Sequence, residues 1–401
     1  MKSVTSKIRR LPALAAAFCT AGAHPAERPA EQPAEHPAAS ASTRRTLLGA
    51  AGLLLALGSA AQAAQTAPAL PKTAFVYVSP VGEAGWTYQH EQGRRAAEQA
   101  LPGLQTTAVE SVAEGADAER VMRDLAQQGY QLIFATSFGY LEPALRVAAD
   151  FPQLRIEHAG GYKTAPNLNT YNAHFYEGRY LAGLLAGKSS KSGVAGYVAG
   201  FPLPEVVQGI NAFALGMRAA NPKAQVRVLW LNNWYDPARE REAALTLVNQ
   251  GADVLTNHSA SPAVPQVAEE KGVRLIAYTS DMRRFAPKAQ LAAVTHHWGR
   301  YYTQRIQAVQ QGQWKPQPVW GGLASGMIEL SALRPDLPKA TRQLIEQRRQ
   351  DIVAGRFSPF SGRLVDNQGR ERQARGVLGD AEIASMDWFV EGVQAASISA
   401  R

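Results

Sequence analysis

The sequence predicts an α/β protein made of two doubly wound lobes, each built on a parallel sheet. From residue 73 onward, short apolar runs rich in β-branched and aromatic residues alternate with stretches whose apolar residues recur three and four apart. Such alternation is typical of a parallel sheet covered by helices on both faces. The order helix, glycine, strand occurs at 125–133 and again at 247–255. A chain of 401 residues can hold two or three compact units at about 100–200 residues each.

Five segments are the clearest strand candidates, at 74–78, 132–135, 226–230, 253–255 and 274–278. Helices are expected near 121–125, 141–149 and 244–248, where the apolar residues follow a helical period. Gly129 and Gly251 each stand between such a helix and the next strand, as a residue ending a helix does. Two facing lobes of this type place their strand-end loops around one cleft, which is where a ligand is expected.

Residues 1–63 are predicted to be a disordered extension followed by an export signal. The first 42 residues are dominated by Ala, Pro, Glu and Ser and have little to bury. Arg44 and Arg45 then precede the apolar run 49–58 and the small-residue site Ala61-Gln62-Ala63. This order is typical of a twin-arginine or Sec signal cleaved after Ala63, and the run is shorter than the roughly 20 residues that span a bilayer. The sequence therefore predicts a periplasmic protein.

Removing this leader changes what the composition implies. The leader holds the single cysteine, Cys19, so neither a disulfide framework nor a cysteine-based zinc site is expected. It also holds seven of the 42 basic and three of the 33 acidic residues, which lowers the net charge from +9 to +5. The remaining basic clusters, Arg283-Arg284 and 342–349, lack interleaved aromatics, so nucleic-acid binding is not expected.

No cofactor or metal is expected either. The sequence has neither of the glycine-rich motifs that cradle nucleotide phosphates. His296 and His297 are adjacent on a predicted strand, where neighbouring side chains point to opposite faces, so they make a poor metal pair.

Three aromatic residues follow directly after predicted strands. Trp86, Phe138 and Trp234 would all lie at the rim of the cleft, where aromatic rings from both lobes can stack on a flat ligand. The alternative is that each simply packs in the core of its own lobe.

Ser137 raises the alternative that the protein is an enzyme. Ala135-Thr136-Ser137-Phe138-Gly139 resembles the nucleophile elbow of a hydrolase, with Ala in place of its first glycine, and histidines follow later in the chain. An exported serine hydrolase is therefore open, although a serine at such a turn is more often a helix cap.

These loops together resemble the basic-membrane-protein (BMP, PnrA-like) family of periplasmic substrate-binding proteins for ABC transporters. The similarity extends over about residues 72–330, and its residues are 85–93, Ser137-Phe138, 177–183, 233–237 and Ser280-Asp281. The resemblance implies a type I binding-protein fold with three hinge crossovers. It also implies a monomer that binds no nucleic acid, catalyses no reaction and delivers a small ligand to a permease in the inner membrane. The lobes are then expected at 64–173 with 296–318, and at 174–295 with 319–401.

The family pattern also implies a ligand. It places base-stacking aromatics at Trp86 and Trp234, and an acidic residue near the base edge at Glu83. Thr279 stands where the family has an aspartate that contacts ribose, and His296 stands where it has a lysine that does the same. Losing both charges together avoids leaving one buried charge unpaired, which is costly. The hypothesis is a free purine base, with adenine preferred; a nucleoside, an aromatic amide or another flat heterocycle is the alternative.

Further polar residues are candidates to read the ring atoms of the ligand: Glu83, Asn172, Thr279, Asp281 and His296. Three of them also have a simpler structural alternative. Asp281 can cap the following segment, Asn172 can terminate a strand, and His296 can be a packing histidine. Whether the role is uptake or sensing through a receptor also stays open.

Overall fold

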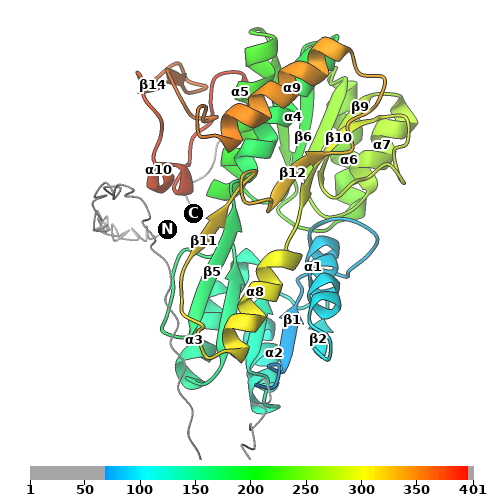
Figure 1. The fold of residues 1–401 in the computed structure, drawn as a ribbon. Helices are drawn as coiled ribbons and strands as arrows, with labels where there is room; N and C mark the ends of the chain where they lie inside the picture. Colours follow the sequence, from blue (N-terminus) through cyan, green and yellow to red (C-terminus); the bar gives the residue numbers. More distant parts are fainter. Residues whose placement is uncertain (1–67, 396–401) are drawn as a thin grey trace, which may run out of the picture. The chain divides into compact units, whose positions relative to one another are not determined.

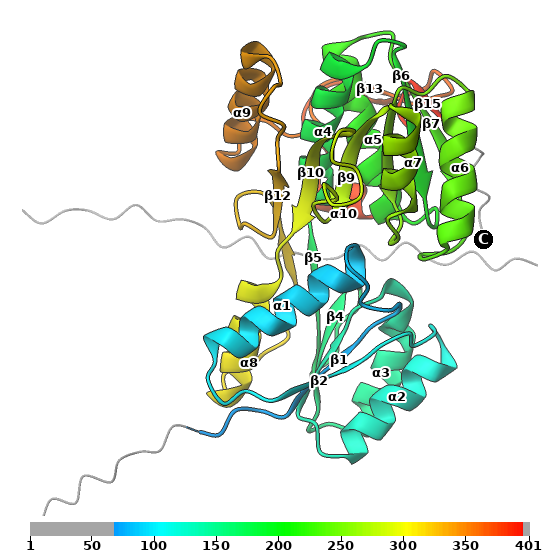
Figure 2. The same ribbon diagram turned by 90° about the vertical axis from the view of Figure 1, so that its right-hand side faces the viewer.

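The computed structural model describes residues 68–395, so the expected extension, export signal and cleavage point lie outside the described residues. Two large, mainly parallel sheets form the centre of the described chain, with helices on both faces of each sheet (Figures 1 and 2). The predicted α/β class with two doubly wound lobes is confirmed.

The first lobe has a six-stranded, all-parallel sheet in the order β2-β1-β3-β4-β5-β11. Helices α1 and α8 pack on one face, and α2, α3 and the short helix η1 cover the other (Figure 2). The strands are β1 (Thr73–Val76), β2 (Thr106–Val109), β3 (Leu132–Ala135), β4 (Arg155–Ala159), β5 (Leu168–Ala173) and β11 (Val319–Gly321). The helices are α1 (Trp86–Ala100), α2 (Ala116–Gln127), η1 (Phe138–Tyr140), α3 (Leu141–Asp150) and α8 (Gly299–Gln310).

The second lobe repeats this winding in the order β12-β10-β9-β8-β6-β7-β15, with β12 antiparallel to β10. Helices α4 and α5 form one layer, and α6 and α7 form the other. The strands are β6 (Val194–Ala199), β7 (Gln225–Trp230), β8 (Val254–His258), β9 (Arg274–Thr279), β10 (Gln290–His296), β12 (Ile328–Ser331) and β15 (Val393–Gln394). The helices are α4 (Phe175–Ser189), α5 (Pro204–Ala220), α6 (Pro237–Asn249) and α7 (Ala263–Lys271).

The C-terminal segment belongs to the second lobe. It contains α9 (Lys339–Val353), a hairpin of β13 (Leu364–Val365) and β14 (Glu371–Gln373), and α10 (Asp380–Ala384), before β15 pairs with β7. Phe360, Ile383 and Phe389 are buried in the same hydrophobic cluster as α4 and α5. Burial of these side chains secures the segment to the lobe.

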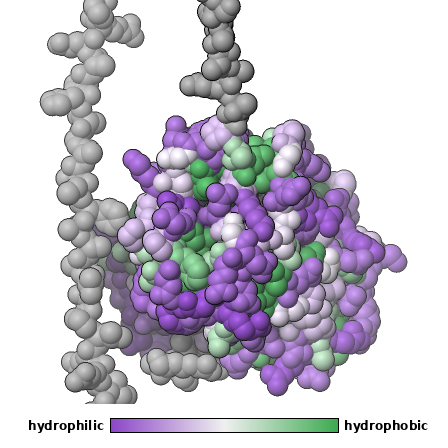
Figure 3. All heavy atoms as spheres, turned by 90° about the horizontal axis from the view of Figure 1, so that it is seen from below, coloured by the Kyte–Doolittle hydropathy of each residue, from purple (hydrophilic) through white to green (hydrophobic). Residues whose placement is uncertain are grey.

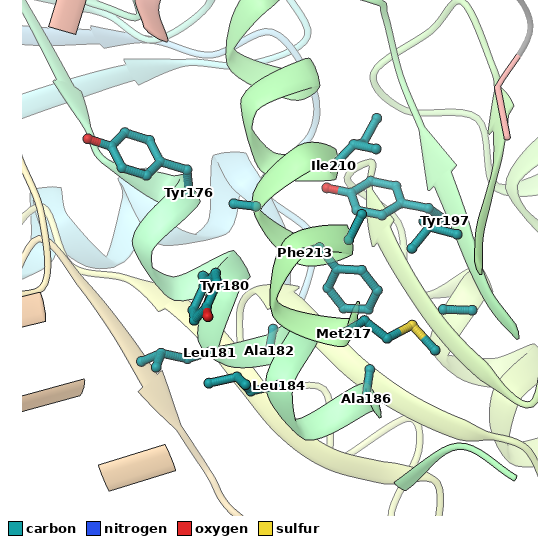
Figure 4. Packing of buried hydrophobic residues seen from close by; sticks show 14 of the residues in the cluster. Tyr176, Tyr180, Leu181, Ala182, Leu184, Ala186, Tyr197, Ile210, Phe213 and Met217 are labelled. Atoms are coloured by element: carbon teal, nitrogen blue, oxygen red, sulfur yellow. The ribbon is translucent and has the colours of Figure 1, made fainter. Parts of the chain in front are cut away.

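The pair α4 and α5 is the most closely packed pair of helices. A Cβ at Gly183 would overlap the backbone of Phe213, and one at Gly216 would overlap the backbone of Tyr180. Figure 4 shows the side chains of Tyr180, Phe213 and Met217 among those that fill the surrounding core. Glycine therefore permits the close approach that buries both helices on most of their surface.

The chain passes between the lobes three times: from β5 to α4, from β10 to α8, and from β11 to β12. The strand Val319–Gly321 pairs with β5, so the last crossing comes after Gly321, a few residues beyond the expected position at 318. The face seen in Figure 3 is mainly hydrophilic, with hydrophobic residues in separate groups. Within residues 68–395, no helix is long and apolar enough to cross a membrane.

Candidate functional site

A cavity lies between the lobes, at the carboxyl ends of strands from both sheets. This position is the one expected for the ligand of doubly wound sheets. Its lining comes from the loops after seven strands: Val78, Ser79, Trp86, Ser137, Phe138, Ala159, Gly160, Leu203, Glu205, Val206, Trp234, His258, Ser259, Ala260 and Thr279. Most of these side chains are apolar or aromatic, and both lobes contribute.

Trp86 is the first residue of α1 and is held in one orientation. Its indole N–H donates to the carbonyl oxygen of Thr136 at 2.6 Å. The ring packs edge-on against His90, with centroids 4.4 Å apart, and against Phe175 at 6.2 Å. Since these contacts fix the orientation of the ring, a ligand that stacks on Trp86 meets a preorganised surface.

Trp234 lines the cavity from the second lobe, in the loop between β7 and α6. Phe201 packs edge-on against the Trp234 ring, with centroids 4.9 Å apart. The carbonyl oxygen of Trp234 accepts the N–H of Ala260 at 3.0 Å. A Cβ at Gly200 would lie only 2.6 Å from Cε3 of the ring. The loop therefore depends on glycine at position 200 to seat this tryptophan.

Glu205 brings the one carboxyl group among the described residues that line the cavity. It lies in the first turn of α5, directly after Pro204, in the second lobe. Its Oε2 accepts a hydrogen bond from Nδ2 of Asn172 at 2.8 Å, and Asn172 belongs to β5 in the first lobe. His258, at the end of β8, has its Nε2 3.9 Å from Oε1 of Glu205. Asn172 thus lies just behind the lining and ties the two lobes together.

Burial sets the protonation state of the Glu205 carboxyl group. It raises the pKa of Glu205 to about 7, a rise that the Asn172 amide partly opposes. Burial, together with the charge of Arg179, holds the pKa of His258 well below its usual range, so this ring is neutral. Arg179 itself is fully buried on α4, donates to Thr256 and to the carbonyl of Asn257, and lies 3.4 Å from the ring centroid of Tyr278.

Ser137, Phe138 and Thr279 also line the cavity, as expected for strand-end residues. The Ser137 hydroxyl donates to Oε1 of Glu114 at 2.6 Å, so its partner is a carboxylate and not a histidine. This geometry does not support the hydrolase alternative, because among residues 68–395 no histidine side chain hydrogen-bonds to this hydroxyl as the serine–histidine pair of such an enzyme requires. The Thr279 hydroxyl donates to the carbonyl of Tyr278 at 2.6 Å.

The structure does not bring the other three candidates into the cavity. His296 is fully buried behind Trp86, with ring centroids 5.8 Å apart, and also packs on Phe175 at 4.5 Å. Glu83 is exposed and pairs with Arg284 at 2.9 Å, and Asp281 pairs with Arg283 at 2.5 Å. Partial burial opposes ionisation of Asp281, but the hydrogen bonds from Arg283 and the Gln290 amide outweigh it and hold the pKa of this carboxyl below its usual value. In this conformation, His296 packs and the two acids form surface ion pairs.

Glu205 and His258 are the functional candidates that the sequence did not point to. Strand β6 reads Val-Ala-Gly-Tyr-Val-Ala and has few β-branched residues, so its sequence did not predict a strand and the segment after it was not expected at the cleft. The proline at the first helical position, followed by an acidic residue, was the available signal for a helix beginning there.

Comparison with known proteins identifies relatives across most of the chain. Residues 70–358 match the family described as ABC transporter substrate-binding protein, PnrA-like. A purine-binding protein of Brucella abortus is 44% identical over 339 residues, covering 84% of this chain and 95% of that protein. A putative ABC transporter glucose-binding protein of Haloferax volcanii is 35% identical over 321 residues, covering 80% of each chain.

Solved structures show the same fold at lower identity. A solute-binding protein of an ABC transporter system from Aeropyrum pernix matches with a TM-score of 0.62 and 19% identity, covering 72% of this chain and 93% of that chain. One from Conexibacter woesei has a TM-score of 0.60 and 21% identity, covering 72% of this chain and 98% of that chain.

Proposed function

This chain belongs to the PnrA-like family of ABC transporter substrate-binding proteins, and from that premise we propose that it captures a free purine base, adenine preferred, in the periplasm. Proteins of this family are not enzymes; they bind a small ligand and work with a membrane permease and its ATPase. The observation that carries the proposal is the pair of tryptophans, Trp86 and Trp234, that line one largely apolar cavity from opposite lobes.

A planar heterocycle suits this lining. An aromatic ring stacked between Trp86 and Trp234 gains dispersion and quadrupole contacts on both faces, worth about 0.5–1.5 kcal/mol per ring pair beyond the buried area. The 44% identical relative is named as purine-binding, which favours a purine over other flat ligands. The family resemblance implies a ribose-contacting aspartate at the position of Thr279, which lines the cavity, so the neutral threonine favours the free base over a nucleoside. Closure of the two lobes then encloses the base before delivery to the permease.

A sugar is the second candidate, because a relative at 35% identity is named as glucose-binding. A hexose stacks on tryptophan but also needs hydrogen-bond partners for several hydroxyl groups. The cavity offers one carboxyl group, and the hydroxyls of Ser137 and Thr279 already donate to neighbours within their own lobes. The purine is therefore the better match to the lining.

Thermal unfolding of the mature chain, freed of co-purified ligand by unfolding and refolding, tests the proposal. At 100 times the dissociation constant, a ligand that binds only the folded state adds about 2.7 kcal/mol, enough to raise the melting temperature by several degrees. We expect this shift with adenine and a smaller one with adenosine or glucose. A shift with adenosine or glucose but none with adenine would overturn the free-base proposal.

Substitution of the tryptophans tests the stacking itself. Trp86→Ala and Trp234→Ala should each weaken adenine binding by about 10-fold or more, since each removes one stacked face and leaves empty space. Trp86→Phe and Trp234→Phe keep an aromatic face and should lose much less, as measured by isothermal titration calorimetry. If the Ala and Phe variants bind adenine equally well, the base does not lie between these rings.

A further inference from the structure

Glu205 is held in a geometry that leaves one carboxylate oxygen free for a ligand. Among residues 68–395, its Oε2 accepts the Asn172 amide at 2.8 Å, while its Oε1 accepts no hydrogen bond. The nearby Nε2 of His258 is 3.9 Å from Oε1, beyond hydrogen-bond distance. An acceptor that faces a largely apolar cavity without a partner is costly, and a ligand N–H would satisfy it.

The orientation of Asn172 fixes this arrangement. Its Oδ1 accepts the backbone N–H of Ala173 at 2.8 Å, so its amide N–H groups must face Glu205. Asn172 therefore supplies a donor to one carboxylate oxygen and stabilises the other as an acceptor. Gly160 lies alongside, where a Cβ would be 3.5 Å from Oε2, an ordinary contact distance.

The chemistry of the ligand then separates two classes. A free purine base carries an N–H on its imidazole ring, at N9 or N7, whereas in a nucleoside N9 carries the sugar. A charge-assisted hydrogen bond from that N–H to a carboxylate is short and about twice as strong as a neutral one. A site built to accept an N–H strongly rejects the analogue that lacks it, because the buried acceptor is left unpaired.

We propose that Glu205 selects a free purine base over its nucleoside by accepting the imidazole N–H of the base through Oε1, with Asn172 as its positioning residue. This inference rests on the proposed function and names the group that gives the protein its preference for a free base. The carboxyl group lies on the helix α5 of one lobe, and its amide partner comes from a strand of the other.

The test compares adenine with 9-methyladenine in the unmodified mature chain and in Glu205→Gln, by isothermal titration calorimetry at pH 7.5. In the unmodified protein, 9-methyladenine should bind about 100-fold more weakly than adenine. In Glu205→Gln, this ratio should fall below about 10-fold, because the Asn172 amide takes the single oxygen of the new side chain and leaves its NH2 group facing the N–H of adenine, whereas 9-methyladenine loses no hydrogen bond. Glu242→Gln, on an exposed glutamate of α6, is the matched control and should keep the 100-fold ratio.

The outcomes separate this inference from the proposed function. A 100-fold ratio that persists in Glu205→Gln means that the methyl group is rejected by space alone, which overturns the role of Glu205 while adenine binding stands. No adenine binding by the unmodified chain overturns the proposed function and this inference together. Circular dichroism and thermal melting show whether Glu205→Gln is folded. If it is not, Glu205→Met, of similar size and without an acceptor oxygen, gives the same comparison.

Discussion

At the scale of single residues, Glu205 makes ligand binding depend on pH. Burial raises the pKa of this group to about 7, so the carboxylate fraction falls as the pH drops below 7. If the carboxylate is the binding form, adenine affinity is greatest above pH 7 and falls by up to tenfold per pH unit below it. We expect the dissociation constant at pH 5.5 to exceed that at pH 7.5 by about tenfold or more, measured by calorimetry in matched buffers.

The other groups around Glu205 do not titrate in this range. Burial holds the pKa of His258 well below its usual value and that of Tyr278 well above its usual value, so both are neutral. Asn172 has no titratable proton. Glu205→Gln should therefore show a flat profile between pH 5.5 and 7.5. The same slope in this variant would assign the pH dependence to another group, including the ligand itself.

At the scale of elements, the position of Trp234 in the loop after β7 depends on Gly200, which begins the loop after β6. A Cβ at Gly200 would lie 2.6 Å from Cε3 of Trp234 and 3.0 Å from the carbonyl oxygen of Asn233. Gly200→Ala should displace the tryptophan and weaken adenine binding by about 2- to 12-fold, the equivalent of one lost stacking contact. Calorimetry measures this loss. Far-UV circular dichroism should be unchanged, since the contact lies in loops.

Gly209→Ala is the matched control for this prediction. Gly209 lies in α5 of the same lobe, and a Cβ there would have its nearest neighbour at 3.5 Å, an ordinary contact distance. This variant should keep the affinity and can gain stability, because alanine favours a helix over glycine. An unchanged affinity in Gly200→Ala would show that the ring of Trp234 does not contact the ligand.

The elements also show which strands and cavity residues could be predicted from the sequence. Strands β1, β3, β7, β8 and β9 were predicted because their β-branched and aromatic runs are distinctive, and the loops after them supplied Trp86, Ser137, Phe138, Trp234 and Thr279 for the cavity lining. The alanine- and glycine-rich β6 was missed, and with it Glu205. Glu83 and Asp281 could not be placed from the sequence, because their pairing with arginines depends on side-chain directions that no spacing specifies.

At the scale of the whole molecule, several contacts cross the cleft and hold the lobes together. The Ser280 hydroxyl oxygen accepts the backbone N–H of Gly85 at 2.9 Å and the side-chain amide of Gln89 at 3.0 Å. Glu83 pairs with Arg284 at 2.9 Å, although this exposed pair contributes little and is screened by salt. Gly85 also meets the backbone of Ala260 so closely that no side chain fits between them. The closed arrangement therefore depends on one glycine at the junction.

Gly85→Ala should hold the lobes apart. Gly85 has φ +98°, a conformation that favours glycine, and its missing Cβ is the space that the carbonyl of Ala260 needs. Gly82→Ala is the matched control, because Gly82 also has a positive φ, +59°, but a Cβ there would have no neighbour within 4 Å. Both variants carry backbone strain, and Gly85→Ala alone places an atom in the path of closure.

Small-angle X-ray scattering with and without adenine measures the difference. The unmodified chain and Gly82→Ala should become more compact when adenine is added, whereas Gly85→Ala should stay at its larger radius of gyration and bind adenine at least about 10-fold more weakly. In the structure, Glu205 contacts Asn172 and Trp234 lines one cavity with Trp86, so a chain whose lobes are held apart should lose both the stacking face and the carboxylate. Equal compaction in all three proteins would mean that the contact between Gly85 and Ala260 does not limit closure.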